Sequence, residues 1–169
     1  MIAVDTSLLA WAVNRHRPEH ARAAAAVDAL ANGAVSWALP WPAAHEFLRL
    51  VTHAHAAPRP LAPREAAGYL TTLLESPSVV PIGPTRRHAD VVAELLHELP
   101  PGSALPPALE LVAVLREHGV REVLSADPSL RRFAFLSVID PIHGPPWSPA
   151  AAPVRRYRRL RGRGAAVRP

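Results

Sequence analysis

The sequence has no cysteine, no lysine and no long hydrophobic run. The absence of cysteine excludes a disulfide framework, a thiolate metal site and a cysteine nucleophile, and it is compatible with a reducing compartment. No apolar segment approaches the roughly 20 residues that a membrane-spanning helix needs. The opening residues carry an acid, Asp5, and no basic leader, which does not fit a signal or transit peptide. We therefore expect a soluble cytoplasmic protein with no membrane span.

Acidic residues are missing from the C-terminal end, where none follows Asp140. Seven of the 19 basic residues, all of them arginine, lie after Pro153, so residues 1–153 hold 12 basic and 14 acidic residues. The net charge of +5 therefore belongs to the end of the chain, because the preceding part carries −2. The exclusive use of arginine, with abundant alanine and proline, is typical of GC-rich coding rather than of selection for guanidinium groups.

The length of 169 residues and the hydrophobic content of 49% predict one compact domain with a substantial core. From residue 141 the composition changes to proline, alanine and then arginine, which buries too little apolar surface to offset the entropy of ordering. We predict a domain at residues 1–143 and a disordered tail at residues 144–169. The tail is either a solvated end or an arginine cluster, with Tyr157 interleaved, that attracts nucleic-acid phosphates.

Short apolar runs alternate with helical patterns along the domain, and proline, glycine and asparagine mark where they end. Gly119, for example, is expected to end a helix in the left-handed conformation. Strands separated by helices predict the α/β class, with a mostly parallel central sheet and helices on both faces. The predicted strands are residues 2–4, 35–39, 78–82, 122–125 and 136–139, and the predicted helices are residues 8–13, 19–31, 63–75, 86–99 and 107–118, with a further helix starting at residue 42.

Two acids, Asp5 and Asp127, each follow a short strand that is expected to be buried, and Glu46 lies on the helix that starts at residue 42. Because the carboxyl ends of parallel strands meet at one edge of a sheet, this pattern predicts a metal-dependent acid cluster there. Each acid also has an ordinary alternative. Asp5 could cap the following helix, with Thr6 holding its carboxylate or providing the cap, Asp127 could form a turn, and Glu46 could face water.

Four segments, taken in order, resemble the PIN-domain ribonucleases of the VapC toxin type. They are residues 2–9 (IAVDTSLL), 37–47 (WALPWPAAHEF), 117–127 with its EHGV and LSAD, and 132–138 (RFAFLSV). The resemblance covers about residues 1–143 and rests on the order and spacing of the segments rather than on any single motif. It implies a PIN-like three-layer sandwich.

The resemblance also implies a toxin of a type II toxin-antitoxin system that hydrolyses RNA phosphodiester bonds with Mg²⁺ or Mn²⁺. Asp5, Glu46 and Asp127 would be the catalytic metal ligands, and Thr6 and Ser125 would support them. Clustered carboxylates fit this chemistry, because they repel one another unless a cation offsets them and because Mg²⁺ prefers hard oxygen ligands. A VapB-like antitoxin, RNA and a second copy of the chain would be its partners.

One departure from the family pattern concerns its third acidic position, which falls on Ala108 when counted back from Glu117. Glu110 is two residues further on, about 200° around a helix, so it can replace that acid only if the helix starts late or irregularly. Ser7 and Ser129 stand where the family has an Asn and a further acid. With one carboxylate fewer, we expect weaker metal binding.

Three hypotheses remain open at this point. The first is an active ribonuclease that uses Asp5, Glu46 and Asp127. The second is a catalytically inactive PIN-like domain that binds an antitoxin or RNA, which Ala108 favours. The third is a general nucleic-acid-binding protein whose arginine tail does the binding, in which case deletion of residues after Pro153 would abolish affinity.

Overall fold

Five short strands run parallel in one sheet with the order β3-β2-β1-β4-β5, in a computed structural model that describes residues 1–54 and 59–149. The strands are β1 (Ile2–Val4), β2 (Trp37–Pro40), β3 (Val79–Ile82), β4 (Glu122–Leu124) and β5 (Ser137–Ile139). The helices are α1 (Thr6–Val13), α2 (His20–Ala31), α3 (Trp41–Thr52), α4 (Pro63–Leu74), α5 (His88–Glu98) and α6 (Leu109–Glu117), with a 3₁₀ helix η1 (Pro128–Arg132).

The strands alternate their side chains between two hydrophobic cores. Ile2 and Val4 of β1 lie in one core, whereas Ala3 between them lies in the other, as the two-residue period of a strand requires. Leu124 and Val123 divide in the same way on β4. Both faces of the sheet are therefore buried at these positions, which explains why β1 is apolar throughout and why β4 is apolar after the exposed Glu122.

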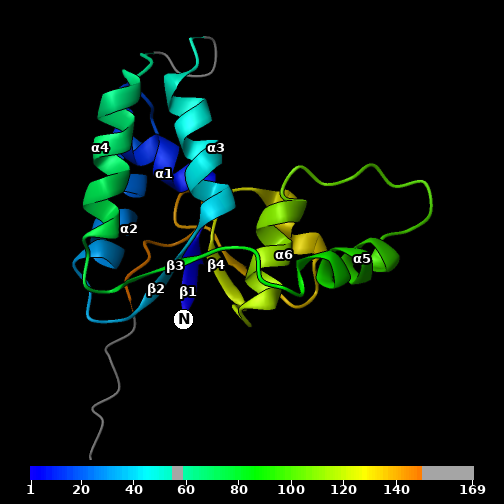
Figure 1. The fold of residues 1–169 in the computed structure, drawn as a ribbon. Coiled ribbons are helices and arrows are strands. Elements are labelled where there is room, and N and C mark those ends of the chain that lie inside the picture. The colour runs from blue at the N-terminus through cyan, green and yellow to red at the C-terminus, as the bar shows by residue number, and fades with distance from the viewer. Residues whose placement is uncertain (55–58, 150–169) are drawn as a thin grey trace, which may run out of the picture.

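Helices cover both faces of the sheet, and Figure 1 shows α1, α2 and α4 on one side with α5 and α6 on the other. Helix α3 contributes to both cores, through Phe47 on one side and Ala43 on the other. The predicted α/β class and three-layer sandwich are confirmed, and the sheet is wholly parallel within the described part of the chain.

The helices begin and end close to the predicted boundary residues, with small shifts. Gly119 follows His118, the C-cap residue of α6, and adopts a positive φ of 65°, as expected for a glycine that closes a helix. Helix α5 starts at His88 rather than at residue 86, because Thr85 accepts a hydrogen bond from the Arg87 amide in a turn before the helix. Helix α6 starts at Leu109, two residues later than predicted, and this leaves Ala108 as its N-cap.

The predicted boundary between domain and tail falls just before the last described residues. Ile142 is buried, and Trp147 packs against the core that contains Ile2 and Val4. The described chain therefore stays in contact with the domain beyond residue 143. The boundary itself stays a prediction. The arginine cluster and the predicted disorder of residues 150–169 lie outside the described residues. In the part that is described, none of the helices combines the length and the hydrophobicity needed to cross a bilayer.

Candidate functional site

The strand order creates a switch point between β1 and β4. From β1 the chain moves outward through β2 to β3, and β4 and β5 are then added on the opposite side of β1. In open parallel sheets of this kind the connecting segments diverge at such a point and leave a crevice at the carboxyl ends of the strands. Asp5 directly follows β1, and Ser125 directly follows β4. The fold thus brings the first and last predicted acids to one edge of the sheet.

Asp5 is a buried carboxylate, 7% exposed, that the fold does not use as a helix cap. It occupies the N-cap position of α1, yet its side chain accepts no hydrogen bond from the helix amides. Its Oδ2 accepts hydrogen bonds from the hydroxyls of Ser7, at 2.9 Å, and Ser125, at 2.7 Å. Burial of a carboxylate is costly, and two neutral hydroxyls offset that cost less than a cation would. The capping alternative for Asp5 is therefore wrong.

Ser125 links Asp5 to the segment that carries Asp127. It is fully buried, and its hydroxyl donates to Asp5 while accepting a hydrogen bond from the Asp127 amide at 2.9 Å. Thr6 behaves differently from the expectation that it would hold Asp5 or cap the helix. Its hydroxyl donates instead to the Ala43 carbonyl on α3, at 3.4 Å, because the first turn of α1 directs Ser7 rather than Thr6 toward the carboxylate.

Asp127 is half-buried and caps η1. Its Oδ1 accepts a hydrogen bond from the Ser129 amide and its Oδ2 accepts one from the Ser129 hydroxyl, each at 2.8 Å. The ordinary turn-forming role considered for this residue is therefore present. It does not remove the carboxylate from the crevice, because Asp127 also lines the cavity described below.

Glu46 lies one turn into α3 and forms an ion pair with Arg49 on the next turn. Both guanidinium nitrogens that face it donate to the carboxylate, with Nε at 2.7 Å from Oε2. The hydrogen bond and the charge of Glu46 raise the pKa of Arg49 above its ordinary value. Both side chains are exposed, 40% for Glu46 and 65% for Arg49. Water therefore competes for both charges, and the ion pair is weak.

Together with Ala108 and Glu110, the three predicted acids line one cavity of about 520 Å³, which we call the carboxylate cavity. Glu110 lies in the first turn of α6 and is exposed. It is the only one of the four acids that makes no hydrogen bond or ion pair within the described residues. Nowhere in residues 1–54 and 59–149 do three metal-binding side chains already converge closely enough to hold an ion. The donor set is nonetheless one of hard carboxylate oxygens, which fits a divalent cation such as Mg²⁺ or Mn²⁺.

Among the lining residues that were not predicted to belong to the site, Ser7 and Arg49 bond to the predicted acids. The spacing of Glu46 and Arg49, three residues apart on one helix, is a sequence signal that predicts their ion pair. Which of two adjacent hydroxyls faces Asp5 depends on the rotation of α1, and the sequence carries no comparable signal for it.

Comparison with known proteins agrees with this arrangement. The model of the PIN domain family matches residues 2–136. Ribonuclease VapC48 of Mycobacterium tuberculosis is 31% identical over 140 residues, which is 83% of this chain and 97% of the relative. Ribonuclease VapC33 of the same organism is 34% identical over 142 residues, which is 84% of this chain and 99% of the relative.

A solved structure with a similar fold is that of VapBC2 from Rickettsia felis bound to a DNA fragment from their promoter. It superposes with a TM-score of 0.58 at 15% sequence identity, and the match covers 82% of this chain and 98% of that chain. At this identity the likeness concerns the fold alone. The family match and the two relatives decide the classification: the chain belongs to the PIN-domain family and, within it, to the VapC ribonucleases.

Proposed function

We propose that this protein is a divalent-metal-dependent endoribonuclease, the toxin of a type II toxin-antitoxin system, and that it hydrolyses RNA at the carboxylate cavity. The observation that carries the proposal is Asp5. It is buried at the switch point of the sheet, its side chain does not cap the helix that follows, and within residues 1–54 and 59–149 two serine hydroxyls hold its carboxylate. A carboxylate placed in this way favours the binding of a positive ion.

The ligands that we propose are Asp5, Glu46 and Asp127, with Glu110 as a fourth. A bound Mg²⁺ or Mn²⁺ would lower the pKa of a coordinated water and stabilise negative charge on the scissile phosphate. Ser125 and Ser7 hold the Asp5 carboxylate in place through their hydroxyls, and Ser125 also fixes the Asp127 backbone. Ser125 is therefore a positioning residue in this proposal.

Glu110 is our candidate to compensate for Ala108. From the sequence, Glu110 can take this role only if the helix starts late, and α6 does start late, at Leu109. Ala108 and Glu110 consequently line the same cavity, although a regular helix would separate them by about 200°. The Glu110 carboxylate is exposed and has no polar partner among the described residues, so it can turn toward an ion without breaking an existing contact.

The competing function is that of an inactive PIN-like domain that binds an antitoxin or RNA. Two observations favour it. Ala108 supplies no carboxylate, and Arg49 occupies the carboxylate of Glu46 in this structure. Metal binding would have to displace Arg49 from Glu46, which the exposure of both side chains makes inexpensive.

The proposed partners are RNA as substrate, a VapB-like antitoxin that covers the cavity, and a second copy of the chain. The antitoxin is supported by the family and by the similar structure, which is of VapBC2. We further propose that the protein acts in the cytoplasm, where its RNA substrates are.

The test is an RNA cleavage assay with antitoxin-free protein that is first treated with a chelator and then supplied with Mg²⁺ or Mn²⁺. We expect metal-dependent cleavage by the wild type, none by Asp5→Asn, and wild-type cleavage by Glu122→Gln, an exposed acid at the opposite end of β4. An inactive wild type in which Ala108→Asp creates metal-dependent cleavage would contradict the active-enzyme proposal and support the inactive PIN-like domain.

A further inference from the structure

A second cavity, of about 410 Å³, lies next to the carboxylate cavity and shares Ser7 and Leu50 with it. Its walls come from α1 and the loop after it, from the end of α3, and from the segment before α4. Its apolar lining residues are Ala10, Trp11, Val13, Leu50, Val51 and Leu61. A cavity of this size and lining accommodates a flat aromatic ligand. A molecule that extends out of the carboxylate cavity past Ser7 would enter it.

The rim of this second cavity is cationic. Arg15, Arg17, Arg59 and His16 line it, and none of its described lining residues is acidic. Arg17 is engaged, since its guanidinium lies over the Trp11 ring at 5.8 Å and pairs with Glu19 at 3.4 Å. Arg15 and Arg59 are exposed, and they make no hydrogen bond or ion pair with any other described residue. Two guanidinium groups are therefore available to bind anions.

We propose that the second cavity binds a nucleobase of single-stranded RNA next to the cleaved bond, with Trp11 stacking on the base and Arg15 and Arg59 binding the flanking phosphates. The inference rests on the proposed function and deepens it, because it assigns residues that determine which RNA is bound. An aromatic surface between cationic groups is how proteins bind unpaired bases, since each base has a π-face and each phosphate a negative charge.

RNA is the occupant that the observations favour. The cavity shares Ser7 and Leu50 with the carboxylate cavity, so a strand whose phosphate lies beside Asp5 can place its neighbouring nucleotide next to Ser7 on this side. Arg15 and Arg59 add positive charge to the lining that no acid among the described residues pairs with, which matches a polyanion. The domain as a whole offers no such charge, because residues 1–153 carry more acidic than basic residues.

The experiment measures binding separately from cleavage. All variants are made in the full-length Asp5→Asn chain, which we expect not to cleave, and are titrated into a labelled single-stranded RNA of about ten nucleotides that the wild type cleaves. Trp11→Ala should weaken binding about tenfold, whereas Trp11→Phe, which keeps a ring, should weaken it by about twofold at most. Removing the base next to the cleaved bond should weaken binding to the Trp11 chain about tenfold and leave binding to the Trp11→Ala chain unchanged.

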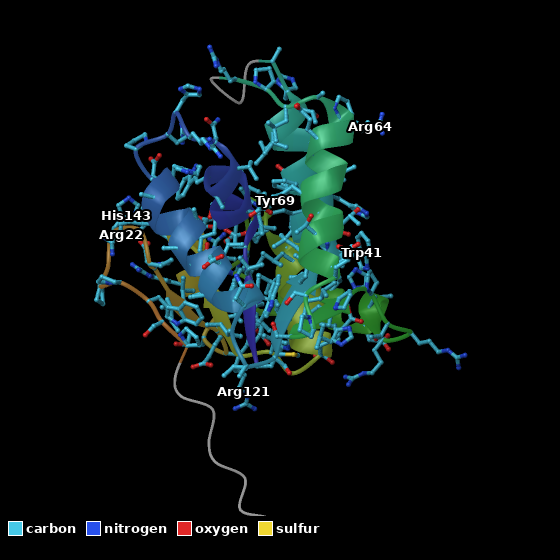
Figure 2. All side chains as sticks on the ribbon, turned by 90° about the vertical axis from the view of Figure 1, so that its left-hand side faces the viewer. Arg22, Trp41, Arg64, Tyr69, Arg121 and His143 are labelled. Carbon is cyan, nitrogen blue, oxygen red and sulfur yellow. The ribbon has the colours of Figure 1, made fainter. Side chains whose placement is uncertain are left out.

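The two arginines are tested by salt dependence. Arg15→Gln and Arg59→Gln should each reduce the slope of log K against log salt by about 0.7, the value for one phosphate contact on a single strand. Arg121→Gln is the matched control, because Arg121 precedes β4 at the amino ends of the strands, and Figure 2 shows it at the end of the molecule opposite to Arg64. Its slope should equal that of the parent chain.

Two outcomes would overturn the inference while leaving the proposed function intact. One is cleavage by the wild type together with unchanged RNA affinity and salt slope in the Trp11 and arginine variants. The other is unchanged RNA affinity in these variants together with loss of binding to the cognate antitoxin, which would make the cavity a protein-docking site. If Trp11→Ala fails to fold, the arginine variants and the base-deleted RNA still decide the question. Failure of the wild type to cleave any RNA would instead contradict the proposed function.

Discussion

Asp5 and Glu117 are both buried carboxylates, but the fold treats them differently. The side chain of Glu117, at the end of α6, has no exposed surface. It accepts hydrogen bonds from the Thr85 amide, at 2.6 Å, and from the His88 ring. These contacts connect the segment before α5 to α6. In the described part of the chain, the carboxylate of Asp5 accepts hydrogen bonds only from the hydroxyls of Ser7 and Ser125.

The pKa of Glu117 reflects the strength of its contacts. Burial by itself would raise this pKa, but the hydrogen bonds from Thr85 and His88 hold it below its ordinary value. The charged form of Glu117 is therefore stabilised by the folded chain itself. Burial alone therefore does not identify a functional acid. An acid whose charged form is already stabilised by a backbone amide and a histidine ring serves the fold, whereas a buried acid that two neutral hydroxyls hold is available for a ligand.

The largest expected effect is the loss of RNA cleavage when Asp5 is replaced, a loss that replacement of Glu117 should not cause. Asp5→Asn should reduce RNA cleavage by at least about 100-fold, because loss of a residue that merely supports a metal ligand already costs about 10- to 100-fold. The asparagine is isosteric and can still bond to both serine hydroxyls, so the free energy of unfolding should be unchanged. Cleavage assays and urea unfolding measure the two quantities on the same preparation. A large loss of stability would mean that Asp5, like Glu117, serves the fold.

Ser125→Ala tests the hydroxyl that holds the Asp5 carboxylate. It removes the donor to Asp5 and the acceptor of the Asp127 amide, so metal affinity and cleavage should each fall by about 10- to 100-fold. Titration of Mn²⁺ measures the affinity. Ser125→Thr, which keeps the hydroxyl, is the control. Equal losses in both variants would point to packing rather than to the hydroxyl.

Glu117→Gln should have the opposite effect to Asp5→Asn. Its amide cannot replace both hydrogen bonds of the carboxylate, so the free energy of unfolding should fall by about 1–3 kcal/mol. RNA cleavage below the unfolding temperature should equal that of the wild type. If cleavage falls as strongly as in Asp5→Asn, the distinction between the two acids is wrong.

The stability difference between wild type and Glu117→Gln should also depend on pH. Because folding lowers the pKa of Glu117, its contribution to stability is present above the unfolded value of about 4.5 and is lost as the pH falls from there through the folded pKa. Urea unfolding of both proteins from pH 7 to pH 3 should show their difference narrowing below about pH 4.5. A difference that stays constant would mean that the carboxylate charge is not what Glu117 contributes.

The smallest expected effect concerns Arg49. Arg49→Gln removes the partner that Glu46 has in this structure, so Mn²⁺ affinity should rise, by no more than about fivefold because the pair is exposed. Arg64→Gln, an exposed arginine of α4, is the control for the change in net charge. A fall in affinity would mean that Arg49 positions Glu46 instead of competing with the ion.

Much of the fold could be predicted from local signals in the sequence. The short apolar runs became β1 to β5, and Gly119 closes α6 as predicted, because these features depend on near neighbours in the chain. The start of α6 was misplaced because two prolines precede Ala108, and proline is as compatible with the turn found there as with the first turn of a helix.

The site was predictable in outline but not in its contacts. Asp5 and Asp127 lie at the same edge of the sheet because they follow parallel strands, a consequence of topology that the sequence pattern contains. The link between Glu117 and His88 joins positions 29 residues apart, and no local pattern predicts it. The donor to Asp5 from α1 likewise depends on how that helix is rotated, so Ser7 takes the place that the sequence suggests for Thr6.

The central claim is that Asp5 belongs to a metal centre and Glu117 does not. Calorimetric titration of Mn²⁺ into the full-length wild type, Asp5→Asn and Glu117→Gln tests it most directly. We expect binding to the wild type and to Glu117→Gln with equal affinity, and no binding to Asp5→Asn. Equal binding to all three proteins, or cleavage of RNA by a wild type that binds no divalent ion, would contradict it.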